Sequence, residues 1–137
     1  MHNAFRTGLL GLTLMCAGAP ALAIEIAVVV NPKNPATRMF SEQASQFFLG
    51  KSSMFVPLDQ AEKSPIRAEF YQKLSGKDIS QVKAAWAKIV FTGKGVAPAE
   101  MHSSAEVKKA IAADVNAIGY IEKSAVDDSV KTILVIP

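Results

Sequence analysis

Residues 59–67 read DQAEKSPIR and run directly into AEFY at residues 68–71. The stretch predicts a loop that becomes a helix at Ser64, because serine is a favoured N-cap and Pro65 suits the first helical position. Gly76 suits the exit from that helix. An apolar stripe along one face follows at every fourth position, formed by Ile66, Phe70 and Leu74.

A helix start presents unpaired N–H groups and a partial positive charge, so it can hold an anion. We expect an oxyanion site formed by the Ser64 hydroxyl, the N–H groups of Ile66 and Arg67, and the forked Arg67 side chain. Pro65 removes one N–H from this group. The alternative is a capped helix that binds nothing.

Residues 1–23 have the features of a secretory signal peptide: the basic Arg6, a short apolar run over residues 8–18, and Ala-Leu-Ala at 21–23 as a cleavage site. An uncleaved membrane anchor is the weaker interpretation because the run is short. A lipoprotein site at Cys16 is rejected because Met15 precedes it. Residues 24–137 are then one domain, periplasmic or secreted, with no membrane insertion after cleavage.

Charge and cysteine content exclude several classes of protein. The formal net charge is +3, and the basic residues are dispersed, so the sequence shows no nucleic-acid or lipid patch. The one cysteine, Cys16, lies in the expected leader, so no disulfide holds the domain. Half of the residues are hydrophobic, which is enough for a core.

Strand-like and helix-like segments alternate, which predicts an α/β layer fold. Asp78 with Gln81, and Ser103 with Glu106, read as capping boxes, and Ser41 reads as a further helix cap. A long polar loop is expected after Phe91. Strands are expected over residues 24–30, 54–58, 118–121 and 132–136, and helices from Ser41, Ser64, Asp78 and Ser103.

Side chains for catalysis are scarce. After residue 23 the one histidine is His102, directly before a helix cap, and there is neither a cysteine nor a G-x-S-x-G elbow. Asp127 and Asp128 lack the further oxygen ligands of a calcium loop and read as a turn. We therefore expect no enzyme activity, no metal and no cofactor.

Two glycine–lysine sites raise the question of phosphate binding. Gly50-Lys51-Ser52 ends like a Walker A motif, but it follows a helix and lacks the earlier glycine, so we read it as a helix end. Thr92, Gly93 and Lys94 also follow a helix. They either form a glycine-rich nest that brings N–H groups and Lys94 to the anion, or are simply a connection.

Several landmarks occur together in order along the chain: VVVNP at 28–32, SEQ at 41–43, FFLGK at 47–51, Trp86 with FTG at 91–93, and AIGYI at 117–121. This ordered set resembles the second lobe of periplasmic phosphate-binding proteins of ABC importers. The resemblance implies a single-lobe periplasmic-binding-protein-like domain of type II. Its mixed sheet would have about four strands flanked by about four helices.

The resemblance also implies a non-enzymatic protein that binds a small oxyanion such as phosphate. In that family an arginine, an acidic residue and Ser-Gly-Thr at a helix start hold the phosphate. Here Gln60 replaces the arginine, Glu62 lies near the acidic position, and Ser64 matches, while Pro65 and Ile66 replace the glycine and threonine. An alternative from another class is a periplasmic protein-interaction or dimerisation module that has lost the solute site.

Overall fold

The computed structural model describes residues 24–137, so the expected signal peptide and its cleavage site lie outside the described residues. One five-stranded mixed sheet has the order β3-β2-β4-β1-β5. β2 runs parallel to β3 and β4, whereas β1 runs antiparallel to β4 and β5. The strands are β1 (Ile26–Val30), β2 (Val56–Gln60), β3 (Ala99–Met101), β4 (Ala117–Glu122) and β5 (Lys131–Ile136).

β1 lies between β4 and β5 in the sheet, and all five of its residues are buried. Alternate side chains point to opposite faces of a strand, so β1 contributes to two cores. Ile26, Val28 and Val30 belong to the larger apolar cluster, and Ala27 and Val29 belong to the smaller one. The near-continuous apolar run in the sequence therefore corresponds to a strand buried on both sides.

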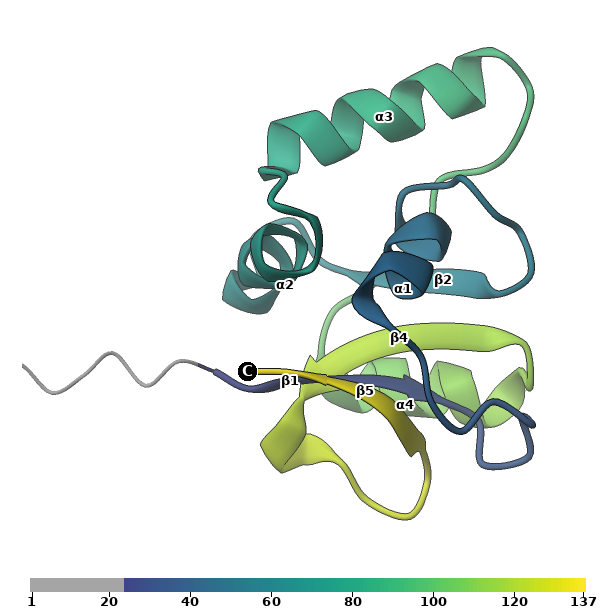
Figure 1. Cartoon of the computed structure of the whole chain (residues 1–137), viewed down its shortest axis with the longest axis vertical. Helices are drawn as coiled ribbons and strands as arrows, with labels where there is room; N and C mark the ends of the chain where they lie inside the picture. Colours follow the sequence, from purple (N-terminus) through teal and green to yellow (C-terminus); the bar gives the residue numbers. More distant parts are fainter. Residues whose placement is uncertain (1–23) are drawn as a thin grey trace, which may run out of the picture.

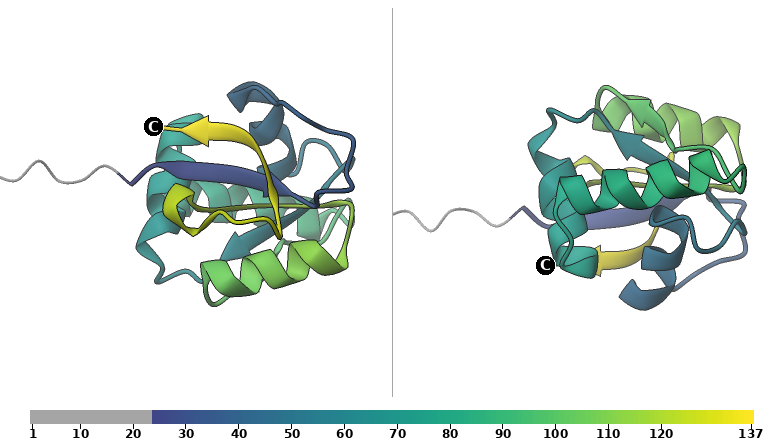
Figure 2. Two further views of the ribbon diagram at one scale, coloured as in Figure 1. Left: turned by 90° about the horizontal axis from the view of Figure 1, so that it is seen from below. Right: turned by 90° about the horizontal axis from the view of Figure 1, so that it is seen from above.

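The helices divide between these two faces (Figures 1 and 2). α4 supplies the smaller core, whereas α1 and α2 cover the other face with α3 as an outer layer (Figure 1). The Trp86 indole on α3 donates a 2.8 Å hydrogen bond to the Phe48 carbonyl of α1. The helices are α1 (Ser41–Phe48), α2 (Pro65–Ser75), α3 (Ile79–Phe91) and α4 (Ser104–Ala113), with a 3-10 turn at Lys123–Ala125.

α4 approaches β4 closely at Gly119. A Cβ atom built there would lie 2.7 Å from a Val107 methyl and 3.1 Å from an Ile111 methyl. The absence of a side chain at this position is therefore what lets the helix pack directly on the strand.

Most of the expected helix caps are present. Ser64 is the N-cap of α2, Pro65 is its first residue, and Gly76 ends it with φ of +70°. The Asp78 carboxylate accepts from the Gln81 N–H at 2.9 Å. The Ser41 cap was wrong: Phe40 precedes α1, and the Gln43 side chain accepts the Phe40 N–H at 2.8 Å.

The expected α/β layers are present, with two differences in the strands. The sheet has a fifth strand, β3, within the expected polar loop, because residues Ala99 to Met101 pair in parallel with the end of β2. β2 itself lies two residues beyond the expected 54–58, since its pairing with β4 begins at Val56 and that with β3 ends at Gln60. Across residues 24–137, no helix has the length and apolar character needed to cross a membrane.

Candidate functional site

The turn from β2 into α2 brings polar side chains to one side of a hollow of about 300 Å³, here called the Arg67 pocket. Its other side is α3, which contributes apolar side chains. The hollow therefore has a charged end and an apolar wall. Its lining residues include Asp59, Arg67, Lys83, Trp86, Val90 and Glu100.

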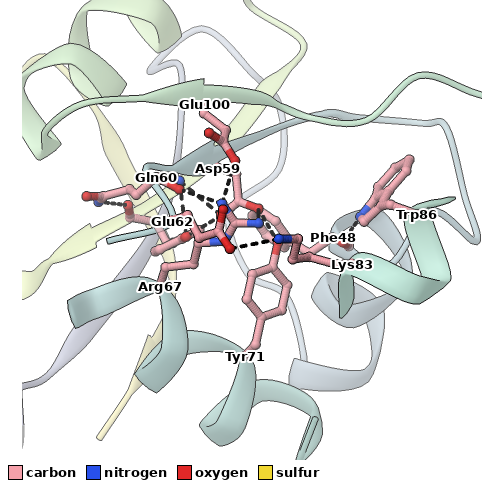
Figure 3. A network of polar contacts seen from close by, with 10 residues as sticks. Phe48, Asp59, Gln60, Glu62, Arg67, Tyr71, Lys83, Trp86 and Glu100 are labelled. Atoms are coloured by element: carbon pink, nitrogen blue, oxygen red, sulfur yellow. Dashed lines mark hydrogen bonds and ion pairs between the residues drawn. The ribbon is translucent and has the colours of Figure 1, made fainter. Parts of the chain in front are cut away.

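Arg67 points inward, with 7% of its side chain exposed (Figure 3). Its Nη1 donates to Glu100 Oε1 at 2.6 Å and to the Gln60 carbonyl at 3.1 Å. Its Nη2 lies 3.6 Å from Asp59 Oδ2, too far for a hydrogen bond. Burial disfavours the charge, but the hydrogen bond to Glu100 and the charge of Asp59 outweigh it, so the pKa of Arg67 is raised.

One edge of the Arg67 guanidinium lacks hydrogen bonds. Nε is buried and has no partner among the described residues, and Nη2 makes only the long ion pair with Asp59. The Nε–Nη2 edge is a fork that suits the bidentate binding of a carboxylate or phosphate. A buried unpaired donor costs about 1–3 kcal/mol, so its presence calls for an explanation.

Asp59, at the end of β2, is enclosed by donors. It accepts hydrogen bonds from the Tyr120 hydroxyl, from the Tyr71 hydroxyl at 2.8 Å, and from the Gln60 N–H at 2.9 Å. Burial raises the pKa of Asp59, although these hydrogen bonds and Arg67 act in the opposite direction. Burial and the nearby carboxylate also raise the pKa of both tyrosines, so both remain protonated donors.

Aromatic packing fixes the positions of these tyrosines. The Tyr120 ring stacks on Phe70 at 3.8 Å with an interplanar angle of 7°, and Tyr71 meets Phe70 edge-on at 5.2 Å. Because the rings are fully buried in a close-packed core, the hydroxyl groups reach Asp59 from fixed directions.

Ser64 begins α2 beside this network. Its hydroxyl accepts no N–H from its own helix and instead lies 3.4 Å from Gln60 Oε1. Gln60 is buried, and its amide donates to the Tyr120 carbonyl at 2.9 Å. Two backbone N–H groups were expected as anion donors. The Arg67 N–H already donates to the Ser64 carbonyl at 3.1 Å, whereas the Ile66 N–H makes no hydrogen bond within residues 24–137.

Thr92, Gly93 and Lys94 lie apart from Ser64 and Arg67. Lys94 lines a second hollow of about 200 Å³, and Trp86 lines both hollows. The N–H groups of Gly93 and Lys94 close the end of α3 by donating to the Val90 and Ile89 carbonyls. They are therefore used in capping the helix and are not turned toward the Arg67 pocket.

The remaining polar candidates lie at the surface. His102 is exposed, and its N–H donates to Glu106 at 2.7 Å. Asp127 pairs with Lys108 at 2.8 Å. Within residues 24–137, no group of three acidic, histidine or cysteine side chains is placed to hold a metal ion.

Sequence reasoning missed Asp59, Glu100, Tyr71 and Tyr120 as members of this site. Asp59 was assigned to a loop, whereas it is a strand residue whose side chain faces the core. Glu100 belongs to β3, a strand of three residues in a polar segment, and it reaches Arg67 only through the parallel pairing of β2 and β3. No local pattern in the sequence predicts the pairing of β2 with β3.

Two solved structures have a fold similar to that of this chain. The chain superimposes on a protein described as a phosphate ABC transporter substrate-binding protein from Clostridium perfringens, solved with bound phosphate, with a TM-score of 0.65, 22% identity, and coverage of 81% of this chain and 45% of that one. A phosphate transport receptor from Vibrio cholerae superimposes with a TM-score of 0.64 and 20% identity. The match covers 81% of this chain and 47% of the receptor. The fold is that of the phosphate receptors.

The expected fold is thus confirmed, including its resemblance to a single lobe. The chain spans just under half the length of each receptor that it matches. No protein-family model matches the sequence, and no curated protein matches it significantly.

Proposed function

We propose that this chain is an exported, non-enzymatic recognition module that binds a small oxyanion, with phosphate as the first candidate. The observation that carries the proposal is the Arg67 edge formed by Nε and Nη2. It is buried beside a hollow and makes no hydrogen bond within residues 24–137. An oxyanion would supply the acceptors that this edge lacks.

The Ser64 hydroxyl is the second proposed donor, together with the Ile66 N–H. A serine N-cap ordinarily accepts an N–H of its own helix, and Ser64 does not. Its hydroxyl donates only a long hydrogen bond of 3.4 Å to Gln60 Oε1, which a bound anion would replace. Support from known proteins comes from the two receptors described above, both of which are named for phosphate.

Nearby carboxylates favour a protonated anion. Glu100 and Asp59 both lie within 4 Å of the guanidinium, so a fully deprotonated anion would be repelled by them. Phosphate keeps at least one proton at neutral pH and can donate it to a carboxylate oxygen. Sulfate has none to donate, so we expect phosphate to bind more tightly than sulfate.

The test is calorimetric titration of the whole chain with phosphate and sulfate. We expect S64A to weaken phosphate binding several-fold with little loss of stability, because its hydroxyl caps nothing. S103A is the matched control, since Ser103 accepts from the Glu106 N–H. It should cost about 1 kcal/mol of stability and leave phosphate binding unchanged.

R67K provides an independent comparison, because lysine keeps the charge but loses the fork. R38K is its control, since Arg38 is exposed and lies over the Phe40 ring. R67K should weaken phosphate binding, whereas R38K should not. No heat with millimolar phosphate or sulfate would overturn the proposal.

Thr92, Gly93 and Lys94 remain in the proposal only as a secondary contact. The Lys94 side chain lines the neighbouring hollow, so we expect K94A to change phosphate affinity less than S64A does. If K94A lost as much phosphate affinity as S64A, or more, the proposed site would move to the end of α3.

Export is proposed from residues 1–23, and a periplasmic or secreted location follows. N-terminal sequencing of the protein recovered from fractionated cells tests this. A mature end at Ile24 supports cleavage after Ala23, and a chain that still begins at Met1 in the cytoplasm contradicts it.

A second candidate function is a protein-interaction or dimerisation module without a solute site. It is favoured by the occupation of Arg67 Nη1 by Glu100, which fills part of the proposed anion position with the chain's own carboxylate. Sedimentation equilibrium distinguishes the two: a monomer that binds phosphate excludes it, and a dimer that is indifferent to phosphate supports it.

A further inference from the structure

Exposed apolar side chains occur at the end of α3 and in the two loops beside it. Phe91 is 92% exposed, Val96 85% and Met54 76%, the three highest values among the large hydrophobic residues described. We call these three residues the apolar tip. Isolated exposed apolar residues are ordinary, but a cluster of nearly free ones marks an interaction surface.

The tip is formed by segments that are distant in the sequence. Ser53, Val56, Lys94 and Val96 line one hollow, and Ile89 and Trp86 of α3 pack against Gly50. The loop before β2 and the loop after α3 therefore meet, and both lie at the same side of the molecule, right of centre in Figure 1 and again at right in the view from above in Figure 2.

Positive charge surrounds the tip. Residues 79–98 contain three lysines and no aspartate or glutamate. Lys83 is paired with Glu62, whereas Lys88 and Lys94 form no ion pair within residues 24–137. Glu62 and Glu100 are engaged by Lys83 and Arg67.

These charges decide which occupant fits. A second copy of the chain joined through the same surface would bring Lys88 and Lys94 of both molecules together, and like charges repel. Although Val96 borders a hollow, all three side chains of the tip are largely exposed, which suits insertion into a soft surface. Exposed apolar groups beside lysines are the combination that binds anionic lipid.

We propose that the apolar tip, with Lys88 and Lys94, docks this protein on an anionic membrane surface. The side chains of Phe91, Val96 and Met54 would enter the interface between headgroups and acyl chains, and the two lysines would contact lipid phosphates. The proposal is independent of phosphate binding at Arg67. Sequence inspection shows no lipid patch because its parts lie about forty residues apart before the chain folds.

The test is co-sedimentation of the whole chain with phosphatidylcholine vesicles, with and without phosphatidylglycerol. The wild type should bind the anionic vesicles and bind them less at high salt, because salt screens the lysines. The double variant F91S/K94E should lose about tenfold or more in partitioning, since it removes the aromatic group that would enter the bilayer and reverses one charge.

V135S/K109E is the matched control, because Val135 on β5 and Lys109 on α4 are also exposed and lie outside the tip and its two loops. It should bind the vesicles as the wild type does. All variants carry the same residues 1–23, so any contribution of that segment is common to them. All four side chains are exposed, so both variants should fold.

Insertion is measured with F91W and brominated lipids, which quench an indole that enters the acyl region. The wild type should show little quenching, since its one tryptophan, Trp86, is only 9% exposed. Three results would overturn the proposal. The wild type could bind neutral and anionic vesicles equally, the control variant could lose as much vesicle binding as F91S/K94E, or the wild type could bind neither kind of vesicle. The last outcome would favour an acidic protein as the occupant.

Discussion

The network around Asp59 and Arg67 differs from the apolar tip in how its side chains match their surroundings. In the network, charged groups lie in the interior and nearly every polar atom has a protein partner. At the tip, apolar groups lie in water without any partner. Both regions depart from the usual distribution of polar side chains outside and apolar side chains inside. The free Arg67 edge is expected to bind a hydrogen-bond acceptor, and the tip is expected to bind an anionic membrane.

The two regions should also contribute very differently to stability. Removing a partner from the buried network leaves a charge uncompensated, whereas removing a side chain from the tip leaves nothing unsatisfied. The following variants test that contrast.

The largest effect is expected for D59A. It leaves Arg67 without its buried counter-ion and leaves the Tyr71 and Tyr120 hydroxyls without their acceptor. We expect a loss of about 3–5 kcal/mol in the free energy of unfolding, measured by denaturant titration. The exposed Asp128 is the control, and D128A should stay within about 0.5 kcal/mol of the wild type. Equal values for both variants would remove the contrast.

The pH dependence of stability tests the same carboxylate. The pKa of Asp59 is raised above its ordinary value of 3.8, so the folded state retains a proton that the unfolded state has already lost. Its contribution is therefore fully present below pH 3.8 and is lost as pH rises through the raised pKa. D59N should flatten this part of the stability curve. An unchanged slope in D59N would assign the titration to another group.

A smaller effect on stability is expected for E100Q, about 1 kcal/mol or less, because half of the Glu100 side chain is exposed. Its effect on binding should be opposite in sign. Removal of a negative charge beside Arg67 should tighten phosphate binding about five- to tenfold. E62Q removes a carboxylate that pairs with Lys83 instead, and should leave the affinity nearly unchanged. A weaker affinity in E100Q would mean that the Glu100 carboxylate accepts the phosphate proton and that this hydrogen bond outweighs the repulsion.

The smallest effect is expected for F91S. Phe91 is almost fully exposed, so its removal should change the free energy of unfolding by less than about 0.5 kcal/mol. Chemical denaturation of the wild type, F91S and W86A provides the comparison. Trp86 lies on α3 five residues before Phe91, but it packs on Gly50 and donates a hydrogen bond to the Phe48 carbonyl. A destabilisation by F91S approaching that of W86A would show that the tip is part of the core.

The sequence predicts this fold well where the signals are local. The β1 run, the Ser64–Pro65 start with the Gly76 exit, and the Asp78–Gln81 box each depend on residues within a few positions of one another. Long-range pairing is where prediction fails. The three-residue β3 exists because it pairs with β2, and the position of β2 depends on β4.

The site follows the same division. Ser64 and Arg67 can be singled out from the helix start alone. The inward turn of Arg67 cannot, because Asp59 and Glu100 reach it only after two strands have paired. The apolar tip is likewise not predictable from the sequence, since the loop before β2 and the loop after α3 meet only when both fold against α3.

β1 is the first strand of the chain and lies inside the sheet, yet both of its neighbours come from the last quarter of the chain. A growing polypeptide therefore carries this buried strand unpaired until nearly all of its sequence has been made. Folding through such distant contacts is slow. The sheet would thus be incomplete until late in synthesis, and a polypeptide without its complete sheet is easier to thread through a narrow channel.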